Sequence, residues 1–178
     1  MNGAERFFKA VGKGDEATAL HCLKGNPSLA RAIGAARSPV FNKQASALIM
    51  AAELGWEGMV TALLQAGSEV TARGALGGMA LHWASWQGHP DIVRHLVAAG
   101  SPLEATDTRF ACTPFFWAVH GFSYHGDAIR RDQLGAARAL LQAGANPDVK
   151  NAEGILAVEL LTDPADAPML DLIRKAGE

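Results

Sequence analysis

The sequence predicts an all-α solenoid in which short helix-turn-helix units stack in a row. The first observation is a set of segments with apolar residues at helical spacing, each of which ends at a glycine. These glycines are 33, 44 and 33 residues apart, at Gly67, Gly100, Gly144 and Gly177. The second is a small apolar-rich segment that begins 20, 20, 30 and 20 residues before them, at Ala47, Ala80, Pro114 and Ala157. Because helices this short cannot bury an apolar stripe alone, neighbouring units are expected to cover one another.

The third observation is the composition. The chain has 178 residues, of which 49% are hydrophobic and 19% charged, values typical of a folded domain and unlike those of disordered chains. It is rich in alanine and has 19 glycines, against 7 Phe, 4 Trp and 1 Tyr. Small residues of this kind suit closely packed helices, in which neighbouring backbones approach one another.

The most regular unit shows how its elements are predicted. The segment MALHWASWQ is too short to be a stable helix alone, and Gly88 ends it. HPDIVRHLVAAG follows, with Pro90 and Asp91 in its first turn and Gly100 just past its end, which is the arrangement that helix termini favour. The buried stripe of this second helix is formed by Ile92, Val93, Leu96 and Val97.

The segment GGMALHWASWQGHPDIVRHLVAAGSPLEATD, residues 77–107, resembles an ankyrin repeat nearly from end to end. It contains the LH-x-A core, the GH turn and the IV-xx-LV-xx-G second helix, and TPFFWAV (113–119) with LLQAGANPDVKN (140–151) is similar. A residue pattern combined with a period near 33 makes this resemblance specific. The resemblance implies an ankyrin-repeat solenoid with β-hairpin-like fingers between its units, on a scaffold that usually mediates interactions.

The repeat pattern divides the chain into five units within a single domain spanning residues 1–178. Their approximate limits are 3–36, 40–72, 73–105, 107–149 and 150–178. The first and last units are expected to be degenerate caps, since FFKAVGKGD and GILAVELLTD keep the pattern only loosely. The fourth unit has a ten-residue insert near 122–132, between its two helices.

Charge, cysteine usage and targeting signals exclude several classes of protein. The 16 Lys and Arg against 18 Asp and Glu give a net charge of −2, which is not the basic footprint of a nucleic-acid-binding protein. Charged residues interrupt MNGAERFFKAVGKGDE where a signal peptide needs an apolar run, and no run is long enough to span a membrane. Cys22 and Cys112 are too isolated for a zinc site or a disulfide scaffold. We expect a soluble, cytoplasmic protein, with a monomer favoured.

Four residues that could carry chemistry are better explained by the scaffold. His82 is the histidine of the TPLH-like motif, which in ankyrin repeats fixes a turn by hydrogen bonding, and His89 lies in the GH turn. Trp83 and Trp117 share a register position that in this family packs between units. The histidines do not converge on one point by spacing, so no metal and no cofactor is expected.

The next register position is the more informative one for function. It contains Glu53, Trp86 and His120, and the position after it contains Leu54, Gln87 and Gly121. In ankyrin repeats these positions face the concave surface and vary with the ligand. An exposed Trp86 would be a large apolar anchor for a partner, but the insert could instead cover it, and both interpretations stay open.

The insert FSYHGDAIRRDQ, residues 122–133, concentrates polar and aromatic side chains, namely Tyr124, His125, Asp127, Arg130, Arg131 and Asp132. Long connections within compact repeats are often functional. One interpretation is that DAIRRDQL extends the second helix by a turn or two, with its charges solvated. The other is a pocket at the concave mouth, formed by His120, Tyr124 and His125 with Trp86 and the fingertip residues Arg109 and Phe110.

The sequence leaves functions of different classes open. A protein-binding module would use the concave face and the fingertips, with Glu53, Trp86, Gln87, Arg109, Phe110, His120, Tyr124 and His125 as the binding residues. A small-molecule pocket or an enzyme would use His120, His125 and Asp127 as its acid and base groups. A structural adaptor would show a flat apolar patch instead. Since no GxSxG, GxxxxGK or HExxH motif occurs, protein binding is favoured over catalysis.

Overall fold

The computed structural model describes residues 2–34, 45–125 and 132–177. Its helices form pairs that follow the sequence units. The first four pairs are α1 (Gly3–Gly12) with α2 (Glu16–Gly25), α3 (Ala47–Leu54) with α4 (Glu57–Gln65), α5 (Ala80–Gln87) with α6 (Pro90–Ala98), and α7 (Pro114–His125) with α8 (Gln133–Gln142). The last unit has the 3₁₀ helices η4 (Ala157–Leu160) and η5 (Pro164–Asp166), followed by α9 (Ala167–Ala176). The chain is therefore an all-α solenoid, as predicted.

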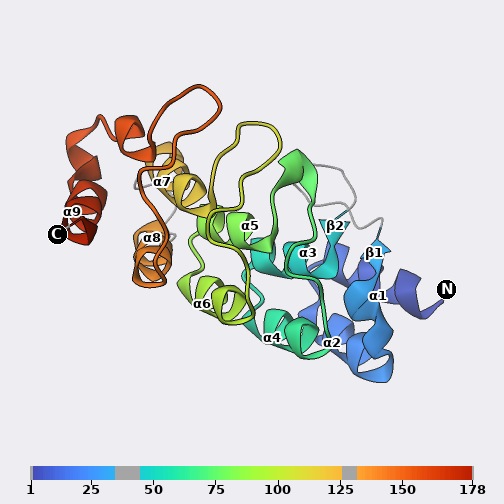
Figure 1. Cartoon of the computed structure of the whole chain (residues 1–178). Helices are drawn as coiled ribbons and strands as arrows, with labels where there is room; N and C mark the ends of the chain where they lie inside the picture. The colour runs from blue at the N-terminus through green and yellow to red at the C-terminus, as the bar shows by residue number, and fades with distance from the viewer. Residues whose placement is uncertain (1, 35–44, 126–131, 178) are drawn as a thin grey trace.

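The pairs stack in sequence order and form two layers. The first helices, α1, α3, α5 and α7, lie in one layer, and the second helices, α2, α4, α6 and α8, lie in the other (Figure 1). The loops between units project on the side of the first helices. We call the surface formed by the first helices and these loops the concave face, and we call the loops fingers.

The fingers differ from regular hairpins. Within the described residues, strands occur only in the first finger, where β1 (Ile33–Gly34) pairs antiparallel with β2 (Ala45–Ser46). Two short 3₁₀ helices, η1 (Pro27–Arg31) and η2 (Ala75–Gly77), lie beside the first and second fingers. Later fingers are closed by single backbone hydrogen bonds, such as Asp107 N–H to the Cys112 carbonyl at 2.9 Å and Asn151 N–H to the Ile155 carbonyl at 3.0 Å.

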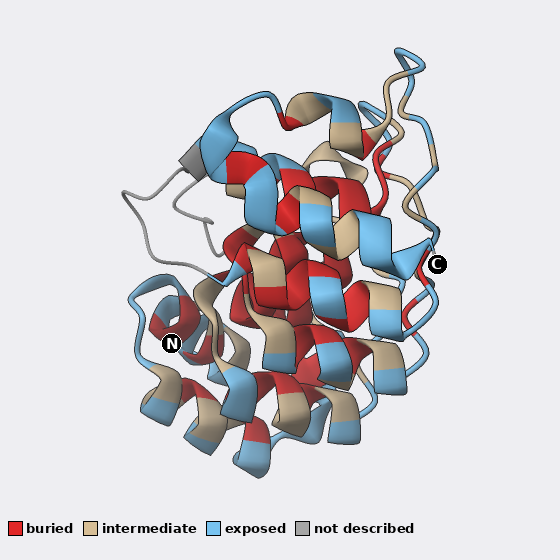
Figure 2. Ribbon diagram, turned by 90° about the vertical axis from the view of Figure 1, so that its left-hand side faces the viewer, coloured by how far each residue is buried: buried red, intermediate tan, exposed pale blue. Residues whose placement is uncertain are grey.

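The core runs continuously between the two helix layers (Figure 2). Alanines are buried wherever first helices meet, for example Ala51, Ala84 and Ala118, which are fully inaccessible. Trp83 and Trp117 are also in the core, with 3% and 7% of their surface exposed, which confirms the structural interpretation of these two residues. Small residues thus bring the backbones together, and the tryptophans fill the wider spaces that remain.

Glycines fix the geometry where α5, α7 and α8 meet. Gly88 ends α5 with φ of 71°, a left-handed conformation that glycine adopts without strain. A Cβ on Gly121 in α7 would lie 2.6 Å from the Trp86 carbonyl oxygen, so only glycine permits this close approach of α7 to α5. The two helices are the most extensively contacting pair in the described part of the chain.

The insert of the fourth unit lengthens its first helix. α7 has 12 residues, whereas α3 and α5 have 8 each, and the additional turn contains Tyr124. α8 begins only at Gln133, because Asp132 is its N-cap and accepts a hydrogen bond from Gly135 N–H at 2.7 Å. The expectation that DAIRRDQL extends the second helix is therefore wrong. Asp127, Arg130 and Arg131 lie outside the described residues.

The degenerate character of the last unit is visible in its first helix. Residues 157–160 form a single turn of 3₁₀ helix instead of a two-turn α-helix. This turn contacts α7, and the Ser123 hydroxyl of α7 donates a hydrogen bond to the Leu160 carbonyl at 3.3 Å. Over the described ranges, the helices are all too short and too polar to cross a lipid bilayer.

Candidate functional site

A cavity of about 370 Å³ opens on the concave face between the third, fourth and fifth units. Its floor is formed by Trp83, Trp86 and Gln87 of α5 and by Phe116, Trp117 and His120 of α7. Its wall is formed by the finger residues Leu76, Phe110, Cys112, Asn151, Glu153 and Ile155, with Leu160 of η4. The lining is thus mainly aromatic and aliphatic, with a few polar groups, which is the composition typical of binding pockets.

The aromatic side chains of the floor contact one another in a continuous series. The ring of Trp117 lies edge-on to Trp83 at 5.0 Å and to Trp86 at 6.1 Å, measured between ring centroids. Trp86 in turn contacts His120 at 5.0 Å and Tyr124 at 5.7 Å. The Trp86–Tyr124 pair is tilted by 38°, whereas the other three pairs are edge-to-face, which is a favourable geometry for aromatic rings at these distances and holds the floor in a defined arrangement.

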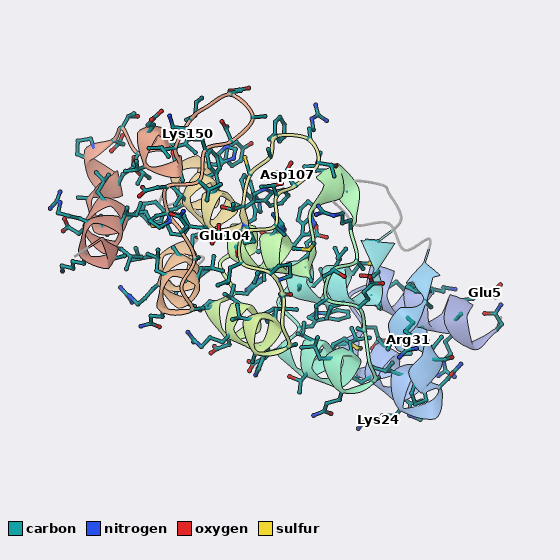
Figure 3. All side chains as sticks on the ribbon, in the orientation of Figure 1. Glu5, Lys24, Arg31, Glu104, Asp107 and Lys150 are labelled. Atoms are coloured by element: carbon teal, nitrogen blue, oxygen red, sulfur yellow. The ribbon has the colours of Figure 1, made fainter. Side chains whose placement is uncertain are left out.

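Asp107 holds the finger that forms one wall of the cavity (Figure 3). One carboxylate oxygen accepts from the backbone N–H groups of Arg109 and Phe110, at 2.8 and 2.7 Å. The other accepts from the Cys112 N–H at 3.1 Å and from the Trp117 indole N–H at 2.9 Å. Only 3% of Asp107 is exposed, so one buried carboxylate fixes both the finger and the orientation of Trp117.

His82 attaches the same finger to α5 from below. Its Nδ1 accepts from Met79 N–H at 3.2 Å, so its Nε2 carries the proton and donates to the Cys112 carbonyl at 3.2 Å. Burial lowers the pKa of His82 from its ordinary 6.5 to about 4. The imidazole is therefore neutral at pH 7 and acts as a structural bridge, as the sequence predicts.

The three fingers around the cavity are joined to one another. The Leu76 carbonyl accepts from Thr108 N–H at 3.0 Å, and the Phe110 carbonyl accepts from Ala152 N–H at 2.7 Å. Leu76 and Ala111 have φ values of 60° and 53°, and they are the non-glycine residues with positive φ in the described chain. Both lie in the fingers that border the cavity. Strained backbone of this kind persists only where the surrounding structure holds it, and it is concentrated at functional sites.

Most of the predicted binding residues come together at this cavity. Trp86, Gln87, Phe110 and His120 line it, and Tyr124, in the additional turn of α7, contacts Trp86 with its ring tilted by 38°. Arg109 places its guanidinium 5.2 Å from the centre of the Phe110 ring, at the rim.

The remaining predicted residues are placed differently. Glu53 belongs to α3, one unit away, and is 6% exposed, so it does not line the cavity. His125 ends α7, but its side chain is not among the described groups, and Asp127 lies outside the described residues. Of His120, His125 and Asp127, the predicted acid and base groups, only His120 has a described side chain.

The wall from the last unit was not anticipated from the sequence. Asn151, Glu153 and Ile155 form a finger in which the Asn151 carboxamide oxygen accepts from the N–H groups of the other two, at 3.0 and 2.9 Å. The segment NAEGI carries the corresponding signal, because an Asn side chain often accepts from the backbone amide two residues later, and Gly154 supplies a residue that tolerates a positive φ in the turn. Asp107 could have been found in the same way, from its bonds to the amides two and three residues later.

Reactive groups at the cavity are few. Burial raises the pKa of the Cys112 thiol to about 12, so the thiol stays protonated and is a poor nucleophile at neutral pH. In the part of the chain that the structure describes, no three His, Cys, Asp or Glu side chains are grouped so that they could hold a metal ion.

A second cavity, of about 380 Å³, lies near the first finger. Its lining is small and polar, with Arg31, Ser68 and Glu69 among small neighbours. Two of these side chains are already bonded to backbone carbonyls, since Arg31 Nε donates to Gly67 and the Ser68 hydroxyl donates to Ala30, at 3.2 and 2.7 Å. No aromatic side chain lines this cavity among the residues that the structure describes.

The chain is similar to known proteins over its N-terminal and central parts. A family model described as ankyrin repeats (3 copies) matches residues 5–107. Mouse CAP-Gly domain-containing linker protein 3 is 38% identical over 105 residues, which are 58% of this chain and 18% of that protein. Drosophila melanogaster palmitoyltransferase Hip14 is 27% identical over 113 residues, which are 64% of this chain and 16% of that protein.

These relatives are much longer than this chain, which spans less than a fifth of their length. Residues 5–107 include more than half of the chain and contain the first three helix pairs, and the fourth pair continues the same stack. The chain belongs to the ankyrin-repeat family.

Proposed function

We propose that this protein binds a partner protein through its concave face, with the aromatic cavity receiving a side chain of the partner. Ankyrin repeats are generally protein-interaction modules, and the proposal assigns that role to one place on this chain. The fingers on either side of the cavity would contact the partner's backbone.

One observation carries the proposal. Among the described residues, the exposed large hydrophobic side chains are Phe110, at 43%, and Tyr124, at 71%. Phe110 lines the cavity, and Tyr124 contacts Trp86, which lines it as well. Repeat packing does not need these side chains at the surface, whereas aromatic side chains around a pocket are the usual anchors of protein interfaces.

The rigidity of the site supports the same function. Asp107, His82 and the bonds between fingertips fix the cavity before any ligand arrives. A preformed pocket loses less conformational entropy on binding, so more of the contact energy appears as affinity.

A displayed library of random peptides tests the proposal with the full chain as bait. We expect peptides that bind the natural chain and lose at least about tenfold in affinity for the double variant Trp86→Ala, Phe110→Ala. The matched control is Trp56→Ala, Phe8→Ala, which removes the same residue types from the N-cap position of α4 and from α1, where both are partly buried. Circular dichroism would confirm that each variant is folded.

The substitution Tyr124→Ala gives a second test that does not depend on core packing, since Tyr124 is mostly exposed. It should weaken the same peptides. Selected peptides whose affinity is unchanged by the cavity variants, or a failure to select any peptide, would contradict the proposal.

A small-molecule ligand is a second candidate, because the cavity volume of about 370 Å³ is within the range of small-molecule sites, about 300–1,000 Å³. Thermal unfolding in the presence of a set of aromatic and heteroaromatic fragments would examine it. A fragment that raises the unfolding temperature of the natural chain but not of Trp86→Ala would favour this candidate over a peptide ligand.

A further inference from the structure

We propose that the side chain received by the cavity is an arginine of the partner protein. The inference rests on the proposed function and specifies the chemistry of its ligand. It follows from three features of the lining: an unsatisfied acceptor, a carboxylate without a basic partner, and aromatic walls.

The acceptor is the side-chain amide of Gln87 at the floor of the cavity. Gln87 is 8% exposed, and within the described chain its Oε1 has no hydrogen-bond donor. A buried polar atom without a partner is costly, on the order of 1–3 kcal/mol, so a ligand that brings a donor N–H recovers this energy. The floor therefore favours a ligand with N–H groups over a purely aliphatic one.

The charge of the lining also favours a cationic ligand. Glu153 is exposed at the wall and takes part in none of the ion pairs found in the described residues. Among the described residues, no lysine or arginine lines the cavity. Two arginines of the neighbouring fingers are already engaged, since Arg109 lies over the ring of Phe110 and Arg73 donates to the Gly77 and Thr106 carbonyls. Within the described lining, a cationic group thus meets the Glu153 carboxylate and no lysine or arginine.

The shape of the walls selects among cationic side chains. Trp86, Trp117 and Phe110 offer ring surfaces, on which a planar guanidinium can stack while its edge donates to acceptors. An ammonium group is compact and strongly hydrated, so it loses more on entering such a pocket. The aliphatic stem of arginine would be covered by Leu76 and Ile155 of the fingers.

The peptides selected against the full chain test this inference directly. We expect arginine to be enriched in peptides whose binding depends on Trp86. In the tightest of them, replacement of that arginine by citrulline, its neutral isostere, should weaken binding on the order of tenfold, and replacement by lysine should weaken it several-fold. Intrinsic fluorescence can measure each affinity, because three of the four tryptophans line the cavity.

Substitutions in the protein test the same contacts as the changes in the peptide. Gln87→Leu and Glu153→Gln should each weaken the arginine peptide about three- to tenfold and leave the citrulline peptide less affected. The control Glu69→Gln removes a carboxylate at the second cavity and should leave the affinity unchanged.

The outcomes separate the two proposals. Peptides that need Trp86 but contain no arginine, or that bind equally well with citrulline, would overturn the arginine inference and leave the concave-face proposal standing. If no peptide depends on the cavity variants, the proposed function fails and the arginine inference fails with it.

Discussion

Two cavities in the described part of the molecule have nearly equal volumes, about 380 and 370 Å³, but different surroundings. The one near the first finger is lined by small and polar residues whose polar groups are bonded to the chain itself. The one between α5, α7 and the last fingers is aromatic and retains an unsatisfied Gln87 oxygen, as far as the described residues show. Volume alone therefore does not distinguish a binding site from a packing irregularity, and the chemistry of the lining does.

A similar contrast appears between α3 and α5, which are the first helices of successive units. In α3, three positions that have counterparts in α5 are Ile49, Met50 and Glu53, all buried. In α5 they are His82, Trp83 and Trp86, of which the last is only partly buried. One scaffold thus gives a closed surface in the second unit and an open aromatic surface in the third, because of a few substitutions at matching positions.

The largest expected effect follows from removal of the carboxylate that holds the aromatic half together. Asp107→Ala leaves three backbone N–H groups and the Trp117 indole without their acceptor. We expect a loss of about 3–5 kcal/mol in the free energy of unfolding, measured by urea denaturation. The control Asp171→Ala removes an exposed carboxylate and should change it by less than about 0.5 kcal/mol. Equal losses in the two variants would contradict the role given to Asp107.

The next effect concerns pH and His82. Because the folded chain holds His82 with a pKa near 4, below its ordinary 6.5, the unfolded chain binds the proton more readily between these values. The contribution of His82 is therefore fully present above pH 6.5 and decreases as the pH falls to about 4, by about 3 kcal/mol in all. In His82→Gln this part of the pH dependence should disappear. Parallel stability curves for the two proteins between pH 7 and 4 would argue against it.

A smaller effect on stability is expected for two glycine substitutions, one where α7 meets α5 and one at the end of α1. Gly121→Ala places a Cβ 2.6 Å from the Trp86 carbonyl oxygen and should cost about 1–3 kcal/mol as α7 is pushed from α5. Gly12→Ala, at the end of α1, meets nothing within 4 Å and should be neutral or stabilising by up to about 1 kcal/mol. Thermal unfolding can show whether each substitution raises or lowers the stability. A stabilised Gly121→Ala variant would show that α5 and α7 do not approach as described.

The smallest effect tests the strain in the finger. Ala111 has a φ of 53°, so Ala111→Gly relieves a conformation that alanine disfavours. Since glycine also gains entropy in the unfolded chain, we expect a net stabilisation of about 0.5 kcal/mol at most. Ala62→Gly, in the interior of α4, should instead lose about 1 kcal/mol. Similar losses in the two variants would mean that the finger is not strained.

Much of the scaffold could be predicted from the sequence, because its signals are local and periodic. The glycine spacing placed the helix pairs, and the register placed Trp86 and His120 on one face with Phe110 beside them. The bonds of Asp107 to the amides two and three residues later form a local turn pattern that the sequence could have indicated, whereas its bonds to the Cys112 N–H and the Trp117 indole depend on how the finger folds back onto α7.

Two further features depended on tertiary structure. Of the residues added to the fourth unit, 122–125 lengthen α7, whereas Asp132 caps α8, which begins at Gln133. The wall that contains Glu153 comes from a finger of the last unit, and its place beside Phe110 depends on how successive fingers align. Sequence periodicity gives the units but not the curvature that brings their loops together.

The central claim is that the aromatic cavity receives a side chain of the partner. The most direct measurement is the NMR spectrum of the four tryptophan indole N–H groups during titration with the tightest selected peptide. The account predicts that the resonances of Trp83, Trp86 and Trp117 shift together, while that of Trp56, which does not line the cavity, stays in place. A titration in which Trp56 alone shifts, or in which the three cavity tryptophans are unchanged at saturation, would contradict it.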